Sequence, residues 1–165
     1  MAEYLKNSKP EAEKAAEDAK VRAIVESTLA EIEQGGDEAV RALSEKFDGY
    51  RPEKFRLTLG EIEALIGELS AEEIADIKFA QEQVRNFAKA QRDSMLDIEV
   101  ETLPGVILGH KNIPVQSVGC YVPGGKFPMV ASAHMSVATA SVAGVPRIIA
   151  CTPPFKGRPN PAVIA

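Results

Sequence analysis

The spacing of apolar residues changes near residue 96, and this change limits the possible folds more than any other feature of the 165-residue chain. Before that point apolar residues recur every three or four positions, as they do in amphipathic helices. After it they alternate or form short runs, as they do in β-strands. The sequence therefore predicts an α/β protein with a helical N-terminal segment, residues 1–96, followed by a strand-containing segment, residues 97–165.

Two helices joined as a hairpin are predicted for the first fifty residues. The first runs from Pro10 to Gln34, where the pair Gly35-Gly36 ends it. The second begins at Asp37, a residue suited to cap a helix, and ends at Asp48-Gly49.

Capping signals predict two more helices before residue 96, the second of which runs to about Ser94. Each signal is a hydroxyl residue followed three positions later by glutamate, which is the spacing of a capping box. A short strand is also predicted over residues 55–59, where apolar residues alternate. The two capping pairs are Thr58 with Glu61 and Ser70 with Glu73.

Strand signals follow residue 96. Residues 98–100 and 106–108 are rich in β-branched and apolar residues and flank a Pro104-Gly105 turn, which predicts a β-hairpin.

A strand, helix, strand unit is predicted after this hairpin. The strands are residues 117–122 and 147–152, and between them lies a helix of small residues, 129–143. A connection of this length suits a parallel crossover, so we expect the start of a Rossmann-like parallel sheet. Residues 161–165 only begin another helix, so we also expect the sheet to be incomplete at the C-terminus.

Charge and composition exclude several classes of protein. The net charge is -5, and all but one of the 24 acidic residues lie in the first 100 positions, which disfavours a nucleic-acid-binding role. No segment has the length and apolar character of a membrane span, and the N-terminus lacks the apolar core of a signal peptide. We therefore expect a cytoplasmic protein. Cys120 and Cys151 fit no metal-binding spacing and are expected to be free, buried thiols.

The strongest local signal is the loop Tyr121-Val122-Pro123-Gly124-Gly125, which follows a strand and precedes a helix. Ligands of open α/β sheets bind beyond the carboxyl ends of the strands, where helix starts present unpaired N–H groups. Tyr121 offers a flat ring and a hydroxyl, Pro123 restricts the backbone, and Gly124 and Gly125 can adopt a positive φ. These four residues are the candidate cofactor-binding residues. The alternative is an ordinary turn between a strand and a helix.

The other polar residues favour structural roles. His134 has no Cys, Asp or His partner at metal-ligand spacing, so packing inside the helix is favoured over catalysis or metal binding. The small residues of the same helix favour close packing against the sheet over the lining of a pocket. The sequence thus gives no catalytic residue and no metal ligand.

Several motifs at matching distances resemble the histidinol dehydrogenase family, and the resemblance spans nearly the whole chain but under half of a family member. It implies Rossmann-like domains, an intertwined homodimer, and zinc- and NAD-dependent oxidation of an alcohol to an acid in two hydride transfers. It also implies that Tyr121 contacts NAD and that Gly124 and Gly125 shape the same loop. The matching segments are Val118 to Gly125, Met135, Ala143 to Val145, Thr152 to Pro154, Gln34 to Val40 and Lys46 to Asp48.

The resemblance does not identify the substrate, and it places the catalytic residues of the family outside this sequence. The family's zinc ligands and its glutamate-histidine acid-base pair lie beyond the last residue given, so the 165 residues alone are expected to be inactive. Thr139 stands where histidinol-oxidising members usually have proline, and residues 126–135 look more like relatives that act on sulfonated diols. The expected substrate is therefore histidinol or another small polar alcohol, such as 2,3-dihydroxypropane-1-sulfonate. The alternative function is a non-catalytic binding or assembly module.

Overall fold

A computed structural model describes residues 10–124 and 126–165. By their contacts the residues form two compact units, one ending at Pro52 and the other running from Glu53 to Ala165. The helices predicted after residue 58 thus group with the strands. The division of the chain into a helical segment, residues 1–96, and a strand-containing segment, residues 97–165, stays a prediction.

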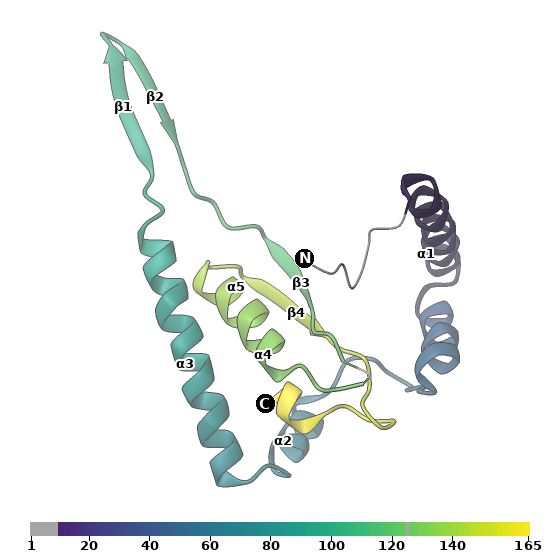
Figure 1. Ribbon diagram of the computed structural model, residues 1–165. Helices are drawn as coiled ribbons and strands as arrows, with labels where there is room; N and C mark the ends of the chain where they lie inside the picture. Colours follow the sequence, from purple (N-terminus) through teal and green to yellow (C-terminus); the bar gives the residue numbers. More distant parts are fainter. Residues whose placement is uncertain (1–9, 125) are drawn as a thin grey trace, which may run out of the picture. The chain divides into compact units, whose positions relative to one another are not determined.

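The first unit contains α1 (Glu11–Asp48), in which two helical stretches meet at a kink. The predicted break at Gly35-Gly36 is thus confirmed, but the two stretches are joined by a kink and not by the turn of a hairpin. The helical conformation is interrupted at Gly36, whose φ of 54° and ψ of -139° lie outside the helical region. The glycine pair therefore bends the chain, as expected, but helical turns continue directly after it (Figure 1). The helix ends at Gly49, which takes the left-handed conformation (φ 62°) and donates its N–H to the Glu45 carbonyl.

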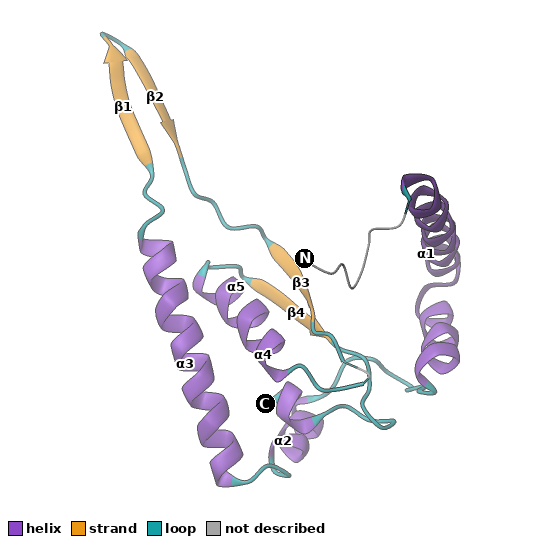
Figure 2. Ribbon diagram, in the orientation of Figure 1, coloured by secondary structure: helices purple, strands orange, loops and turns teal. Residues whose placement is uncertain are grey.

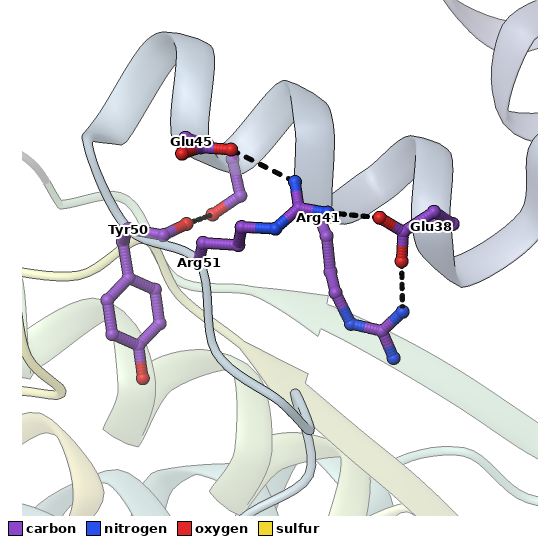
Figure 3. Close-up of polar contacts among 6 residues, drawn as sticks. Glu38, Arg41, Glu45, Tyr50 and Arg51 are labelled. Atoms are coloured by element: carbon purple, nitrogen blue, oxygen red, sulfur yellow. Dashed lines mark hydrogen bonds and ion pairs between the residues drawn. The ribbon is translucent and has the colours of Figure 1, made fainter.

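Ion pairs hold the segment after α1 against the last turns of this helix (Figure 3). The Arg51 guanidinium contacts both Glu38 and Glu45, and Arg41 donates to Glu38 at 2.8 Å. The hydrogen bond from Arg41 and the positive charge of Arg51 hold the pKa of the Glu38 carboxyl below its usual value. The Ser44 hydroxyl adds a hydrogen bond of 2.6 Å to the Tyr50 carbonyl.

The second unit begins with two helices, α2 (Leu59–Ile66) and α3 (Ala71–Asp93), and both predicted capping boxes are present. The strand predicted over residues 55–59 is wrong (Figure 2). The apolar residues alternate, but the Thr58 hydroxyl accepts the Glu61 N–H and caps a helix at this point. Leu59 is therefore the first residue of α2 and not the last residue of a strand.

Replacing Ser70 by alanine should lower the free energy of unfolding by about 1 kcal/mol. The Ser70 hydroxyl accepts the Glu73 N–H at 3.2 Å, and the Ser70 N–H donates to the Glu73 carboxylate at 2.8 Å. These two bonds satisfy N–H groups that the start of α3 would otherwise leave unpaired. Urea denaturation of the full-length protein measures the change. Ser141→Ala, which removes a hydroxyl from within α5 (Thr139–Val142), is the control, and an equal loss in both variants would contradict the capping role.

The β-hairpin is present as predicted. Strand β1 (Ile98–Leu103) pairs antiparallel with β2 (Val106–His110), and Gly105 supplies the positive φ (80°) that the turn requires. Within the part of the chain that the structure describes, the two strands pair only with each other, and every residue in both is exposed. The hairpin thus lies on the surface of this unit, and burial of its side chains contributes little to its stability.

The parallel strand pair is also confirmed. Strands β3 (Ser117–Tyr121) and β4 (Arg147–Cys151) pair in parallel, with Tyr121 opposite Cys151. The chain between them forms a continuous helix over residues 130–142, which we call the central helix. It consists of α4 (Val130–Ala133), a π-helical segment η1 (His134–Ala138) and α5.

The central helix lies against α3, which contacts both η1 and α5. The buried residues of this region come from α3, β3, the residue directly after β3 and the central helix: Ile77, Ala88, Cys120, Val122, His134 and Ala138. The last element, α6 (Pro161–Ile164), is capped by the Asn160 side chain and contacts α2. The fold is therefore of the predicted α/β class, a helical part followed by the small, incomplete start of a parallel sheet. None of the helices in the described ranges is both long enough and apolar enough to span a membrane.

Candidate functional site

The candidate loop begins where Tyr121 ends β3. The next residue extends the pairing by one step, because the Val122 N–H donates to the Cys151 carbonyl at 2.8 Å. Alternation along the strand gives the two neighbours opposite environments: Val122 is 1% exposed, whereas Tyr121 is 66% exposed. The buried valine anchors the loop to the core, and the tyrosine is left accessible to a ligand.

Gly124 allows a close approach of two loops. It does not use the positive φ that is open to glycine. A Cβ at Gly124 would instead lie 3.0 Å from Pro153 Cγ and 3.4 Å from Thr152 Oγ1. The glycine thus lets the loop after β3 approach the loop after β4.

The other predicted loop residues are only partly described. Pro123 is exposed, and the Lys126 N–H donates to the Gly124 carbonyl at 3.2 Å. Gly125 lies outside the described residues. The central helix begins only at Val130, and its N-cap residue Met129 makes no side-chain capping bond.

Thr152 and Pro153 belong to the same site, and the sequence reasoning did not select them. They directly follow β4, and the carboxyl ends of parallel strands meet at one edge of a sheet. Their position after the second strand was therefore a usable signal. The site is formed by two adjoining loops at this edge, with an exposed aromatic ring on the first of them.

His134 is 7% exposed, which agrees with its predicted packing role. It lies in the π-helical segment of the central helix, a kind of segment often found at functional sites. Burial disfavours the charged imidazolium and lowers the pKa of His134 below its ordinary value of 6.5.

The buried His134 predicts a loss of stability in acid. Between the lowered native pKa and the unfolded value of 6.5, the unfolded state binds a proton that the native state does not. The free energy of unfolding should therefore fall as the pH decreases below 6.5, until the native pKa is passed. Urea denaturation of the full-length protein at several pH values measures this slope, and His134→Gln should reduce it. An unchanged slope in the variant would show that His134 is not the group that causes the loss of stability in acid.

The two cysteines differ in environment. Both are free thiols, as predicted, and Cys120 is buried. Cys151 is exposed, so the prediction that it is buried is wrong. It is the last residue of β4, and most residues of this strand are exposed. Among the described residues β4 pairs with β3 alone.

The described residues do not fit a zinc site. Within residues 10–124 and 126–165, no group of three or more His, Cys, Asp or Glu side chains is arranged to hold a metal ion. A structural or catalytic zinc needs three or four such ligands. The loop residues Tyr121 and Gly124, by contrast, present an exposed ring beside a closely packed backbone, which suits a planar cofactor.

Three curated proteins are similar in sequence to this chain. The chain is 57% identical over 157 residues to a histidinol dehydrogenase homolog of Shouchella clausii, covering 95% of this chain and 37% of the relative. It is 44% identical to sulfopropanediol 3-dehydrogenase of Ruegeria pomeroyi, covering 94% and 35% respectively. It is 38% identical to histidinol dehydrogenase of Aliivibrio fischeri, covering 84% and 31%. The chain thus spans about a third of the length of these relatives.

A solved structure gives the same result. The crystal structure of histidinol dehydrogenase from Elizabethkingia anophelis superposes with a TM-score of 0.81 at 26% identity, covering 98% of this chain and 35% of that one. The family model described as histidinol dehydrogenase matches residues 11–165. On these matches, which extend from α1 to α6 and include the loop at Tyr121, the chain belongs to the histidinol dehydrogenase family.

Proposed function

We propose that the chain is the N-terminal part of an NAD- and zinc-dependent dehydrogenase that oxidises a small polar alcohol to the acid in two hydride transfers. The observation that carries the proposal is the exposed Tyr121 ring at the carboxyl edge of the parallel strands, in a chain of this family. NAD, when bound, accepts the hydride from the alcohol carbon.

The residues of this chain would bind and orient the cofactor. The Tyr121 ring gives a flat face for stacking, and its hydroxyl can hydrogen-bond to a ribose or an amide. Val122 fixes the position of that ring through its buried side chain and its bond to Cys151. Pro123, Gly124 and Gly125 complete the proposed cofactor-binding loop.

Zinc is assigned to the rest of the full-length protein. The described residues offer no suitable ligand group, so we derive no step through the metal from this chain. We accordingly expect the 165 residues alone to be inactive. A cytoplasmic location and a homodimer of full-length chains are further parts of this proposal.

The substrate is proposed as histidinol or a sulfonated diol. The relative named sulfopropanediol 3-dehydrogenase is 44% identical to this chain, and the relative from Aliivibrio fischeri named histidinol dehydrogenase is 38% identical. Because the chain is similar in sequence to each of these two relatives, the proposal keeps both substrate classes.

An NADH absorbance assay of the purified full-length protein tests the function. Histidinol and 2,3-dihydroxypropane-1-sulfonate are supplied separately, and the acid product is identified by mass spectrometry. Two NADH formed per acid would support the proposal, and the faster substrate identifies the class. No NADH from any small polar alcohol, with zinc present, would reject the dehydrogenase and favour a binding or assembly module.

A further inference from the structure

An ion pair links the loop after β4 to the turn between α2 and α3. The Arg158 Nη2 atom, in the loop between β4 and α6, lies 2.6 Å from Glu68 Oε1 and 2.5 Å from Glu68 Oε2. The two partners are 90 positions apart in the sequence. Among the described residues, no other side chain of residues 152–159 makes a hydrogen bond or ion pair outside this segment.

The segment that carries Arg158 has little conformational freedom. Three of its eight residues, 152–159, are prolines, whose rings fix φ. Phe155 and Arg158 exchange two backbone hydrogen bonds, of 2.8 and 3.4 Å, across a tight turn. Lys156 and Gly157 at its centre both have positive φ, 53° and 78°, as in a two-residue hairpin turn. Fixing Arg158 therefore also limits the movement of the residues directly after β4.

Those residues form one side of the candidate site. Pro153 packs so closely against the loop after β3 that a Cβ at Gly124 would lie 3.0 Å from Pro153 Cγ. A shift of the loop after β4 would therefore change the contact between the two loops at the edge where Tyr121 lies. The side chains of Arg158 and Glu68 are 51% and 48% exposed, so their ion pair contributes little to the free energy of unfolding. Its effect is expected on the position of the loop.

We propose that Arg158 is a positioning residue for the cofactor site. Through Glu68 it holds the loop after β4 against the loop at Tyr121, in the arrangement that binds NAD. This inference rests on the proposed function, because it requires that NAD binds at this edge. The alternative is that the charge of Arg158 attracts the phosphates of NAD directly. A positioning pair needs both partners, whereas direct attraction of an anion needs only the arginine.

Calorimetric titration of the full-length protein with NAD separates the two roles. Arg158→Gln and Glu68→Gln should each weaken NAD binding about 3-fold, because each breaks the same ion pair. Direct attraction predicts instead that Glu68→Gln leaves the affinity unchanged or raises it, since this variant removes a negative charge. The double variant Glu68→Arg with Arg158→Glu reverses the pair and should recover most of the affinity. The midpoint of urea denaturation should change little in each variant.

Arg147→Gln is the matched control. It removes the same charge from the opposite, amino end of β4, where Arg147 is exposed, and should leave NAD binding unchanged. A wild-type protein that does not bind NAD would reject the proposed function and this inference with it. Wild-type binding together with full affinity in Arg158→Gln or Glu68→Gln, or no recovery in the reversed pair, would overturn this inference alone.

Discussion

Gly109→Ala should open the β1–β2 hairpin. Gly109 lies in β2 opposite Glu99 of β1. A Cβ at this position would overlap the Ile98 carbonyl oxygen and would lie 3.1 Å from its carbon and 3.2 Å from Glu99 Cα. All three atoms belong to the backbone, so no side chain can turn aside to make room. The strands must separate or shift their register, and both outcomes break hydrogen bonds of the ladder.

The free energy of opening the hairpin should fall by roughly 2 kcal/mol or more, which is at the upper end of the usual range for one substitution. Amide hydrogen exchange of the full-length protein measures it, because exchange through local opening of residues 98–110 should accelerate about 30-fold. Gly119→Ala is the matched control, since Gly119 also lies in a strand and a Cβ there meets nothing within 4 Å. Unchanged protection of the hairpin in Gly109→Ala would show that the backbone contact is not tight.

Tyr121→Ala should weaken NAD binding to the full-length protein about 10-fold or more. The ring is exposed at the edge where the two loops meet, so its removal takes away a stacking face. Because the side chain is exposed, the free energy of unfolding should change little. Calorimetric titration with NAD measures the affinity.

Two other variants separate the possible causes of a loss. Tyr121→Phe keeps the ring, so it should retain most of the affinity if stacking dominates and lose it if the hydroxyl dominates. Phe79→Ala removes an aromatic ring of equal exposure (65%, against 66% for Tyr121) from α3, and should leave NAD binding unchanged. Undiminished affinity in Tyr121→Ala, or the same loss in Phe79→Ala, would reject the role of Tyr121.

Local signals predicted much of the fold correctly. Both capping boxes, the Pro104-Gly105 hairpin turn and the Asn160-Pro161 helix start depend on hydrogen bonds within a few residues, so the sequence alone determines them. The parallel strand pair followed from the length of the connection and the rule that favours crossovers.

The errors arose where one pattern has two structural solutions. Alternating apolar residues over 55–59 were assigned to a strand, although Thr58 already starts a helix. Gly35-Gly36 was correctly assigned to a break between two helical stretches, but the break at Gly36 is a kink and not the turn of a hairpin. The first case is a choice between a strand and the start of a helix, and the second is a choice between a turn and a kink. A short apolar pattern decides neither.

The candidate site was predicted in part for a different reason. Tyr121 could be selected because a strand end before a Gly-rich loop is a local feature. The close approach of Gly124 to Pro153, and the packing of α3 against η1, bring together residues far apart in the chain. Such contacts depend on tertiary packing, and the spacing of apolar residues along the chain gives no information about it.

The most direct test is a crystal structure of the full-length protein with NAD. The account predicts that the dinucleotide lies at the carboxyl edge of β3 and β4, with the Tyr121 ring in contact with it and the adjoining loops unchanged in position. A dinucleotide bound elsewhere, with the Tyr121 ring in solvent or packed against its own chain, would contradict it.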